Sequence, residues 1–231
     1  MAITDFLERN ARLYPDEVSL VEINPGNRPD HAMTWREFNL IEAAAAEKYR
    51  REMTWKAFDV KANRFANLLL TRGVRKGDKV ALLLMNCLEW LPIYFGILKA
   101  GAIAVPLNYR YTAEEIQYCL TLAEVNTLIF GPEFTGRVEQ IADRLHGVRT
   151  FFYVGQDLPS FADSYDRLVG YCSSTAPAIE LTDDMHAAIY FSSGTTGFPK
   201  AILHNHAALV GSCRTEQNHH GQTHEDVFLC I

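Results

Sequence analysis

Five short apolar runs recur along this chain, and a stretch of helical character separates each run from the next. Apolar runs that do not alternate with polar residues are typical of strands buried on both faces. The alternation of such strands with helices predicts the α/β class, in which helices flank a mostly parallel sheet. The expected strands are residues 79–85, 102–107, 127–130, 150–154 and 186–191.

The stretches between these runs carry the marks of helices. In residues 56–72 the apolar side chains recur at steps of three and four, and Gly73 is a natural stop. Thr112 and Glu115 form a capping box that opens a helix. The remaining expected elements are helices near 88–100, 112–124, 135–145 and 160–169 and a Ser-rich loop at 172–180.

One stretch invites a different interpretation. Residues 91–107 hold a single charge, that of Lys99, and reach the lower limit of a membrane span. Two prolines and two glycines interrupt the stretch, and its two halves differ in character. A buried helix followed by a buried strand is therefore the interpretation that we favour.

The composition excludes some classes of function. The 231 residues are 48% hydrophobic and 22% charged, which is ordinary for a globular protein. A formal charge of −6 argues against a nucleic-acid-binding surface. The cysteines are odd in number without a C-x-x-C spacing, and no secretory signal is visible, so free thiols in the cytoplasm are expected. The cysteines are Cys87, Cys119, Cys172, Cys213 and Cys230.

The last of the five apolar runs ends in a segment of unusual composition. Every position from Ser192 to Gly197 carries a hydroxyl group or no side chain, and Lys200 follows. Backbone N–H groups and hydroxyls of such a segment approach a phosphate without hindrance from a Cβ atom. Phe198 and Pro199 precede the lysine, so the segment is not a Walker loop. A phosphate-binding loop is predicted, and a flexible Gly/Ser linker is the alternative.

Residues 193–200 closely resemble the signature of the adenylate-forming enzymes, Ser-Gly-Thr-Thr-Gly-x-Pro-Lys, and Ala201 departs from the glycine that usually follows. This superfamily includes acyl-CoA synthetases, peptide-synthetase adenylation domains and luciferases. Residues 66–81 and 98–108 resemble two further blocks of the superfamily, in the same order. The resemblance extends over roughly residues 53–231.

The resemblance implies an enzyme that joins a carboxylic acid to ATP and then passes the acyl group to a thiol, most often that of coenzyme A. The implied cofactors are ATP, Mg²⁺ and coenzyme A. The hydroxyl groups of the loop would donate to the β- and γ-phosphates, the glycines would permit close approach, and the lysine would balance charge. The implied phosphate-binding residues are Ser193, Gly194, Thr195, Thr196, Gly197 and Lys200.

Histidines form a second group of candidates. His206 stands where the superfamily often has a histidine, which implies a place near the nucleotide, and a surface or capping role is the alternative. His219, His220 and His224 suggest a zinc site. They lack a cysteine or carboxylate at a recognised spacing, so a polar connection is favoured and no metal site is predicted. No residue of this chain is assigned a catalytic role.

The end of the sequence also bears on function. In the superfamily, the strand that residues 226–231 resemble is followed by more than half of the enzyme, including a small C-terminal domain with a catalytic lysine. We therefore expect residues 1–231 to be a partial N-terminal AMP-binding domain of an acid–CoA ligase, without the small domain and inactive alone. The alternatives are a non-catalytic nucleotide- or protein-binding module and an enzyme of the luciferase or peptide-synthetase type.

A short repeat precedes the amphipathic helix. Residues 33–38, Met-Thr-Trp-Arg-Glu-Phe, and residues 53–58, Met-Thr-Trp-Lys-Ala-Phe, are near copies. The superfamily normally carries one such element. We expect a duplicated insertion covering about residues 26–50, with the second copy as the native element.

Overall fold

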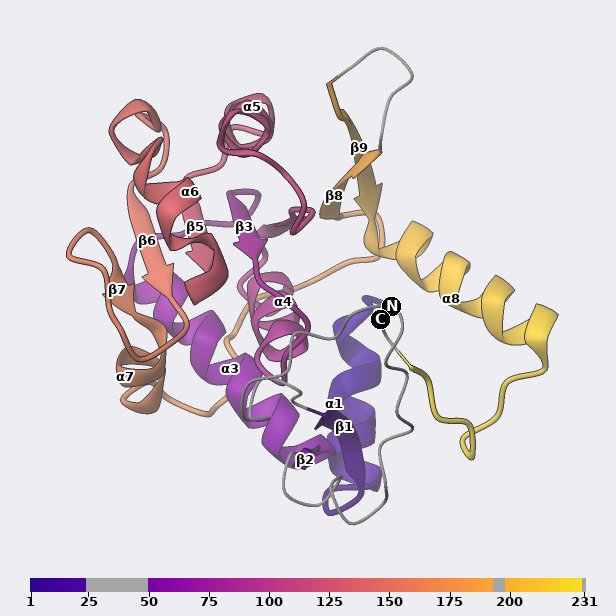
Figure 1. The fold of residues 1–231 in the computed structure, drawn as a ribbon. Coiled ribbons are helices and arrows are strands. Elements are labelled where there is room, and N and C mark those ends of the chain that lie inside the picture. Colours follow the sequence, from indigo (N-terminus) through magenta and orange to yellow (C-terminus); the bar gives the residue numbers. More distant parts are fainter. Residues whose placement is uncertain (24–49, 193–197, 230–231) are drawn as a thin grey trace, which may run out of the picture.

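A computed structural model describes residues 1–23, 50–192 and 198–229 (Figure 1). The insertion expected at about 26–50 therefore lies almost entirely outside the described residues. The expected α/β class is confirmed, because a seven-stranded sheet, mostly parallel, forms the centre of the molecule. The strands follow one another across the sheet in the order β7-β6-β5-β3-β4-β8-β9.

All five strands predicted from the apolar runs are present in this sheet. They are β3 (Lys79–Leu83), β4 (Ile103–Pro106), β5 (Thr127–Phe130), β6 (Thr150–Tyr153) and β8 (His186–Ser192), and the two strands that were not predicted are β7 (Asp163–Ser164) and β9 (Lys200–Asn205). Neighbouring strands are parallel except at the last boundary, where β9 runs antiparallel to β8. β8 pairs with β4 at a single position, Ala104 with Ala188.

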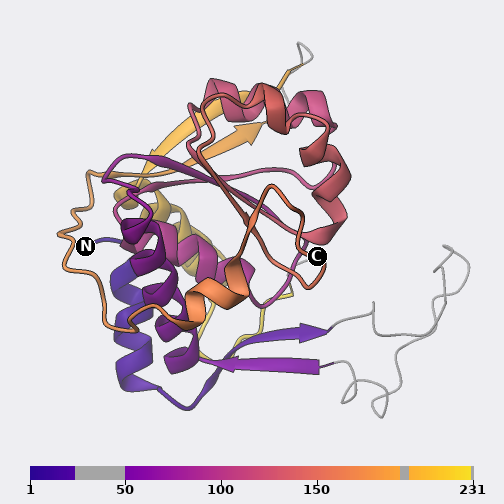
Figure 2. The same cartoon turned by 90° about the vertical axis from the view of Figure 1, so that its left-hand side faces the viewer.

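Helices cover both faces of the sheet (Figures 1 and 2). Successive side chains of β3 point to opposite faces of the sheet, and those of residues 80–83 are buried under helices. Val80 and Leu82 pack with one set of helices, and Ala81 and Leu83 pack with the other. The first set is α3 (Trp55–Thr71), α4 (Trp90–Lys99) and α7 (Tyr165–Gly170), and the second is α5 (Ala113–Leu122) and α6 (Thr135–Glu139). The helix expected over 135–145 is thus shorter than predicted, and a 3-10 turn at Ala142–Arg144 follows it. The helix expected at 160–169 begins only after β7.

The helix ends follow the sequence signals. The Thr112 side chain accepts from the Glu115 N–H group, and the Glu115 carboxylate accepts from the Thr112 N–H group, so the predicted capping box is confirmed. Gly73 has a φ of +83° and ends α3, as expected. Its N–H group donates to the Leu70 carbonyl, and the next N–H group reaches back to Leu69.

A smaller unit lies beside the N-terminal end of α3. It contains α1 (Thr4–Leu13) and the antiparallel pair β1 (Val18–Ile23) and β2 (Arg50–Thr54), none of which the sequence patterns predicted. The second copy of the repeat forms the junction between this unit and the main core. Met53 and Phe58 are buried, and the Thr54 side chain caps α3 by accepting from the Ala57 N–H group.

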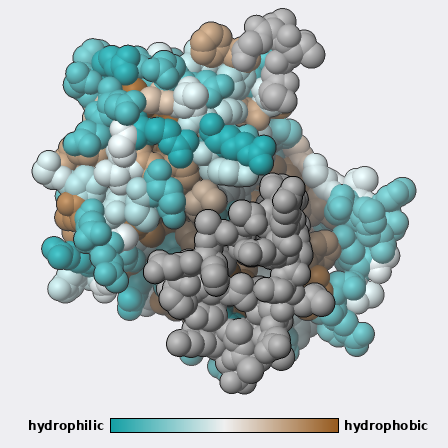
Figure 3. All heavy atoms as spheres, in the orientation of Figure 1, coloured by the Kyte–Doolittle hydropathy of each residue, from teal (hydrophilic) through white to brown (hydrophobic). Residues whose placement is uncertain are grey.

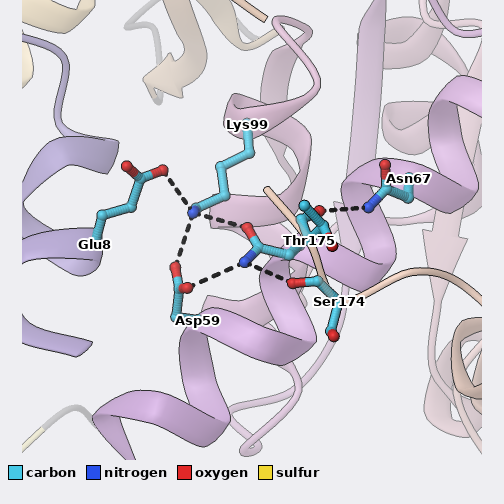
Figure 4. A network of polar contacts seen from close by, with 7 residues as sticks. Glu8, Asp59, Asn67, Lys99, Ser174 and Thr175 are labelled. Carbon is cyan, nitrogen blue, oxygen red and sulfur yellow. Dashed lines mark hydrogen bonds and ion pairs between the residues drawn. The ribbon is translucent and has the colours of Figure 1, made fainter. Parts of the chain in front are cut away.

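The stretch at 91–107 forms α4 and β4, as expected, and its lone charge is buried. The Lys99 ammonium group lies 2.8 Å from a carboxylate oxygen of Glu8 and 2.8 Å from one of Asp59 (Figure 4). It also donates to the Asn63 side-chain oxygen at 2.8 Å. Every helix within the described ranges is too short or too polar to span a bilayer.

The same asparagine connects this buried charge to a long irregular segment. The Asn63 amide donates to the Ser174 carbonyl at 3.1 Å, and the Asn67 amide donates to the Thr175 carbonyl at 2.8 Å (Figure 4). The Asn67 amide also donates to the Ser173 carbonyl at 2.8 Å. The expected Ser-rich loop at 172–180 lacks helix and strand, as predicted. It passes around α3 on its way to β8 (Figure 2). Side-chain amides of α3 thus fasten the chain on its way to the last hairpin.

The last described elements depart from expectation. After β9 comes α8 (His206–His220), which extends away from the sheet (Figure 1). The strand-like run at 226–231 is described as far as residue 229, and residues 226–229 form no strand. A strand exists only when a neighbour satisfies its N–H and carbonyl groups, and these residues have no such neighbour among those described.

Candidate functional site

The predicted phosphate loop joins β8 to β9. Ser193, Gly194, Thr195, Thr196 and Gly197 lie outside the described residues, whereas the residues on both sides are described. Ser192 ends β8, Lys200 begins β9, and the two stand opposite each other in the antiparallel pair. The two ends of the segment are therefore held side by side.

The position of this segment suits a ligand. β8 runs parallel to β4, so Ser192 stands at the carboxyl end of a parallel strand. Ligands of open α/β sheets bind beyond the carboxyl ends of the strands. The Lys200 side chain is exposed, and no carboxylate among the described residues pairs with it. A positive charge at this end of the sheet is thus free to meet an anionic ligand.

An aromatic contact holds the far end of the segment. The rings of Phe198 and Tyr118 lie 4.6 Å apart, centroid to centroid, at an interplanar angle of 35°. Tyr118 belongs to α5 and is partly buried against the core on that face of the sheet. Pro199 is buried, and Lys200 is exposed. Sequence reasoning missed Tyr118, because eighty residues separate it from Phe198 and no motif connects the two.

β8 is fastened to α4 by a pair of tyrosines. The hydroxyl groups of Tyr94 and Tyr190 lie 2.8 Å apart, and the Tyr190 ring contacts the His204 ring of β9. Burial raises the pKa of both tyrosines, so both phenols stay neutral. This contact fixes β8 two residues before Ser192.

His206 lies at the opposite end of β9 from Lys200. A six-residue strand rises about 3.4 Å per residue, so about 17–20 Å separate the two residues. His206 begins α8, only 1% of it is exposed, and its Nδ1 atom lacks a partner among the described residues. Burial lowers its pKa. The structure therefore does not bring His206 and Lys200 together.

The other histidine candidates lie at the end of α8. His219 and His220 are exposed in its last turn, and His224 follows in an exposed turn. The His220 ring lies 3.4 Å from the Glu216 carboxylate. Within the described ranges, no group of three or more histidine, cysteine or acidic side chains is arranged to hold a metal ion. The four described cysteines are free thiols.

Fold and site together define a class of protein: an α/β protein with a candidate phosphate loop at the carboxyl end of a parallel strand. A family model described as "AMP-binding enzyme" matches residues 7–231. The chain belongs to this family, and the resemblance seen in its three sequence blocks is confirmed.

Two relatives with similar sequences are both CoA ligases by name. Over 158 residues, 68% of this chain, it is 32% identical to the long-chain-fatty-acid–CoA ligase FadD13 of Mycobacterium tuberculosis. Over 165 residues, 69% of this chain, it is 35% identical to a crotonobetaine/carnitine–CoA ligase of Salmonella typhi. The matched regions are 30% and 32% of those proteins, so the chain spans about a third of the length of these relatives.

Solved structures show the same partial overlap. The anthranilate CoA ligase AuaEII, in complex with anthranoyl-AMP, superposes with a TM-score of 0.75 at 29% identity over 89% of this chain and 35% of its own. The N-terminal domain of FACL13 from Mycobacterium tuberculosis gives 0.70 at 27% identity, over 89% of this chain and 44% of its own. The chain thus corresponds to less than half of that one domain.

Proposed function

We propose that this chain supplies the nucleotide-phosphate-binding part of an ATP-dependent carboxylic acid–CoA ligase. One observation carries the proposal: a segment of hydroxyl residues and glycines, followed by a lysine that pairs with no carboxylate of the described residues, joins two strands at the carboxyl end of a parallel strand. Family membership supports the reaction type, and the names of the relatives favour a thiol ligase over a luciferase or peptide synthetase.

The reaction proposed for the whole enzyme has two steps. In the first, the carboxylate oxygen attacks the α-phosphorus of ATP, pyrophosphate leaves, and an acyl-adenylate forms. In the second, the thiol of coenzyme A attacks the acyl carbon, and AMP leaves with the bonding electrons. The cytoplasm, where ATP and coenzyme A are available, is the proposed location.

The proposed residues address the electrostatic cost of the first step. A carboxylate must approach a triphosphate that is itself strongly anionic. Ser193, Thr195 and Thr196 would donate to the β- and γ-phosphates, and Gly194 and Gly197 would allow the backbone to approach. Lys200 would offset the negative charge of the leaving pyrophosphate. Mg²⁺ bound to the triphosphate would contribute further positive charge.

The test is a calorimetric titration of the 231-residue protein with MgATP. We expect Lys200→Ala and Thr196→Ala to weaken binding about tenfold or more, because each removes a donor to a charged oxygen. Lys56→Ala, at an exposed lysine in the first turn of α3, is the matched control and should bind like the wild type. Binding that is indifferent to both loop substitutions would contradict the proposed site.

A second measurement addresses the expectation that this chain is inactive alone. The protein is incubated with MgATP, coenzyme A and a panel of aliphatic and aromatic carboxylic acids, and release of AMP and pyrophosphate is followed. We expect nucleotide binding without turnover. Formation of acyl-adenylate by the 231 residues would contradict that expectation, whereas failure to bind any nucleotide would favour a protein-binding module.

A further inference from the structure

The geometry points to Tyr118 as a positioning residue for the lysine of the proposed phosphate site. This inference rests on the proposed function, but it concerns a residue outside the phosphate-binding segment. The superfamily signature leaves the position of Phe198 open, and in this chain its ring contacts that of Tyr118. Tyr118 acts on Lys200 through Phe198 and does not touch the phosphates.

The contact joins a rigid element to a short stretch of chain. Tyr118 lies in the second turn of α5, whose first turn is fixed by the capping box. The same helix buries Ile116, Cys119 and Leu120 against the sheet. The position of the Tyr118 ring is therefore fixed by α5, and the centroid of the Phe198 ring lies 4.6 Å from its centroid.

Pro199 transmits the position of Phe198 to Lys200. Its ring fixes its own φ near −65°, and a residue that precedes proline is restricted to extended conformations. Phe198 and Pro199 thus form a stiff dipeptide, and Pro199 is buried as well. Fixing the Phe198 ring consequently fixes the backbone from which the Lys200 side chain extends.

The contact also complements the strand pairing. Pairing with Ser192 fixes Lys200 along the edge of the sheet but leaves the hairpin free to tilt toward either face. Tyr118 lies on the face covered by α5 and α6, the face on which Ile189 packs. The aromatic pair therefore sets the tilt of the hairpin end toward α5, and with it the side from which the ammonium group approaches a phosphate.

The experiment compares Tyr118→Ala, Tyr118→Phe, Phe198→Ala and the Tyr118→Ala/Phe198→Ala double variant. Tyr171→Ala removes an aromatic ring that is 92% exposed and is the matched control. Two quantities are measured on the 231-residue protein: the Kd for MgATP and the hydrogen exchange of the amides at residues 198–203. Thermal unfolding verifies that each variant is folded.

We expect Tyr118→Ala and Phe198→Ala each to raise the Kd about two- to tenfold and to speed exchange at the start of β9 by a similar factor. Tyr118→Phe, which keeps the ring, should restore both quantities. The double variant should match either single variant, because the contact is lost only once. Tyr171→Ala should change neither quantity.

Unchanged exchange at the start of β9 in a folded Tyr118→Ala variant would overturn the inference. So would a Tyr118→Phe variant as defective as Tyr118→Ala, or strictly additive effects in the double variant. A wild-type protein that binds no MgATP would contradict the proposed function, and the exchange measurement would still decide the role of Tyr118.

Discussion

Only 2% of the Lys99 side chain is exposed, so its ammonium group needs counter-charges inside the protein. Lys99 finds them on two other helices, in Glu8 of α1 and Asp59 of α3. The sequence marks Lys99 as a lone charge in an apolar stretch, but its partners lie 40 and 91 residues away. Pairings at such separation are invisible to periodicity, which reports only local structure.

Removing this charge should be costly. Lys99→Met removes the positive charge beside the Asp59 carboxylate and the donor to the Asn63 amide oxygen, and Asp59 then keeps only the Asn63 amide as a donor among the described residues. We therefore expect the free energy of unfolding in urea to fall by about 3–5 kcal/mol. Glu8→Gln, at a half-exposed partner, should cost less than about 1 kcal/mol. Adding Asp59→Asn to Lys99→Met should recover part of the loss. A Lys99→Met variant as stable as the wild type would show that the network contributes little.

His206 makes stability depend on pH. Burial lowers its pKa from the ordinary value of 6.5, and the nearby terminal ammonium lowers it further, while the Asp5 carboxylate opposes the shift. The unfolded chain therefore binds a proton more readily, so stability rises with pH through the window below 6.5 and is lost as pH falls. Between about pH 7.5 and about pH 5.5, His206→Gln should reduce the slope of unfolding free energy against pH.

The control for this prediction is His146→Gln, at an exposed histidine, which should retain the wild-type slope. Urea unfolding at several pH values measures both. Identical slopes for the wild type and His206→Gln would mean that the imidazole is protonated with equal ease in both states.

At the scale of elements, the turn that follows α5 contains a strained residue. Glu124 has a φ of +53°, and the N–H groups of Glu124 and Val125 close the same pattern that glycine closes after α3. A side chain in the left-handed region costs about 1–2 kcal/mol. Glu124→Gly relieves this cost but adds freedom to the unfolded chain, so we expect a net gain of up to about 1 kcal/mol in urea unfolding.

The comparison variant is Glu124→Gln. It removes only the charge that pairs with Lys79 at 3.2 Å, and because this carboxylate is largely exposed the effect should stay below about 0.5 kcal/mol. A Glu124→Gly variant less stable than Glu124→Gln would indicate that the left-handed turn carries no strain.

Elements that carry a local sequence signal were predictable: the five strands from their continuous apolar runs, and the helix ends from their capping residues. Elements without such a signal, which form only by pairing with a neighbour, were not. The capping box and Gly73 act within one turn of a helix, so the start of α5 and the end of α3 could be predicted from neighbouring residues in the sequence. β9 was missed because its residues become a strand only by lying against β8. The run at 226–231 has strand-like composition, but its described residues, 226–229, pair with no strand of the sheet. The donors at 193–197 remain a prediction.

The choice between the two copies of the repeat shows how packing decides where local sequence does not. Both copies offer the same Met, Thr, Trp and Phe. Beyond them, α3 buries Ala62 and Phe65 completely, whereas the first copy would place Glu42 and Ala45 at those positions. Burying a carboxylate and leaving a cavity are both costly. The second copy therefore suits the core far better.

At the scale of the whole molecule, apolar side chains are exposed near the last hairpin. Val227, Phe228 and Leu229 are mostly exposed, and so are about half of Ile202 and Leu203 on β9. The coloured part of the surface in Figure 3 mixes hydrophilic and apolar areas, and one of the apolar areas lies beside α8. The relatives carry further polypeptide that this chain does not span, and we expect such polypeptide to cover this region.

The 231-residue protein should accordingly self-associate. We expect light scattering to show a mass that rises with concentration, because an unpaired edge strand and exposed apolar residues favour association. Replacing Val227, Phe228 and Leu229 by serine should lower the association. Tyr171→Ser, at an isolated exposed ring, should not. A protein that stays monomeric at high concentration would contradict this expectation.

The single paired position between β4 and β8 has a mechanical consequence. Six antiparallel positions pair β9 with β8, and four parallel positions pair β3 with β4, but Ala104 with Ala188 is the one paired position between the hairpin and the described remainder of the sheet. Beyond it, side-chain contacts such as those of Tyr190 with Tyr94 and of Phe198 with Tyr118 hold the hairpin. A force applied to the chain beyond α8 would act first on the boundary between β4 and β8. The hairpin that bears the proposed phosphate loop would therefore detach as one piece while strands β3–β6 stay paired, so the proposed phosphate site would be lost at forces that the remainder of the sheet withstands.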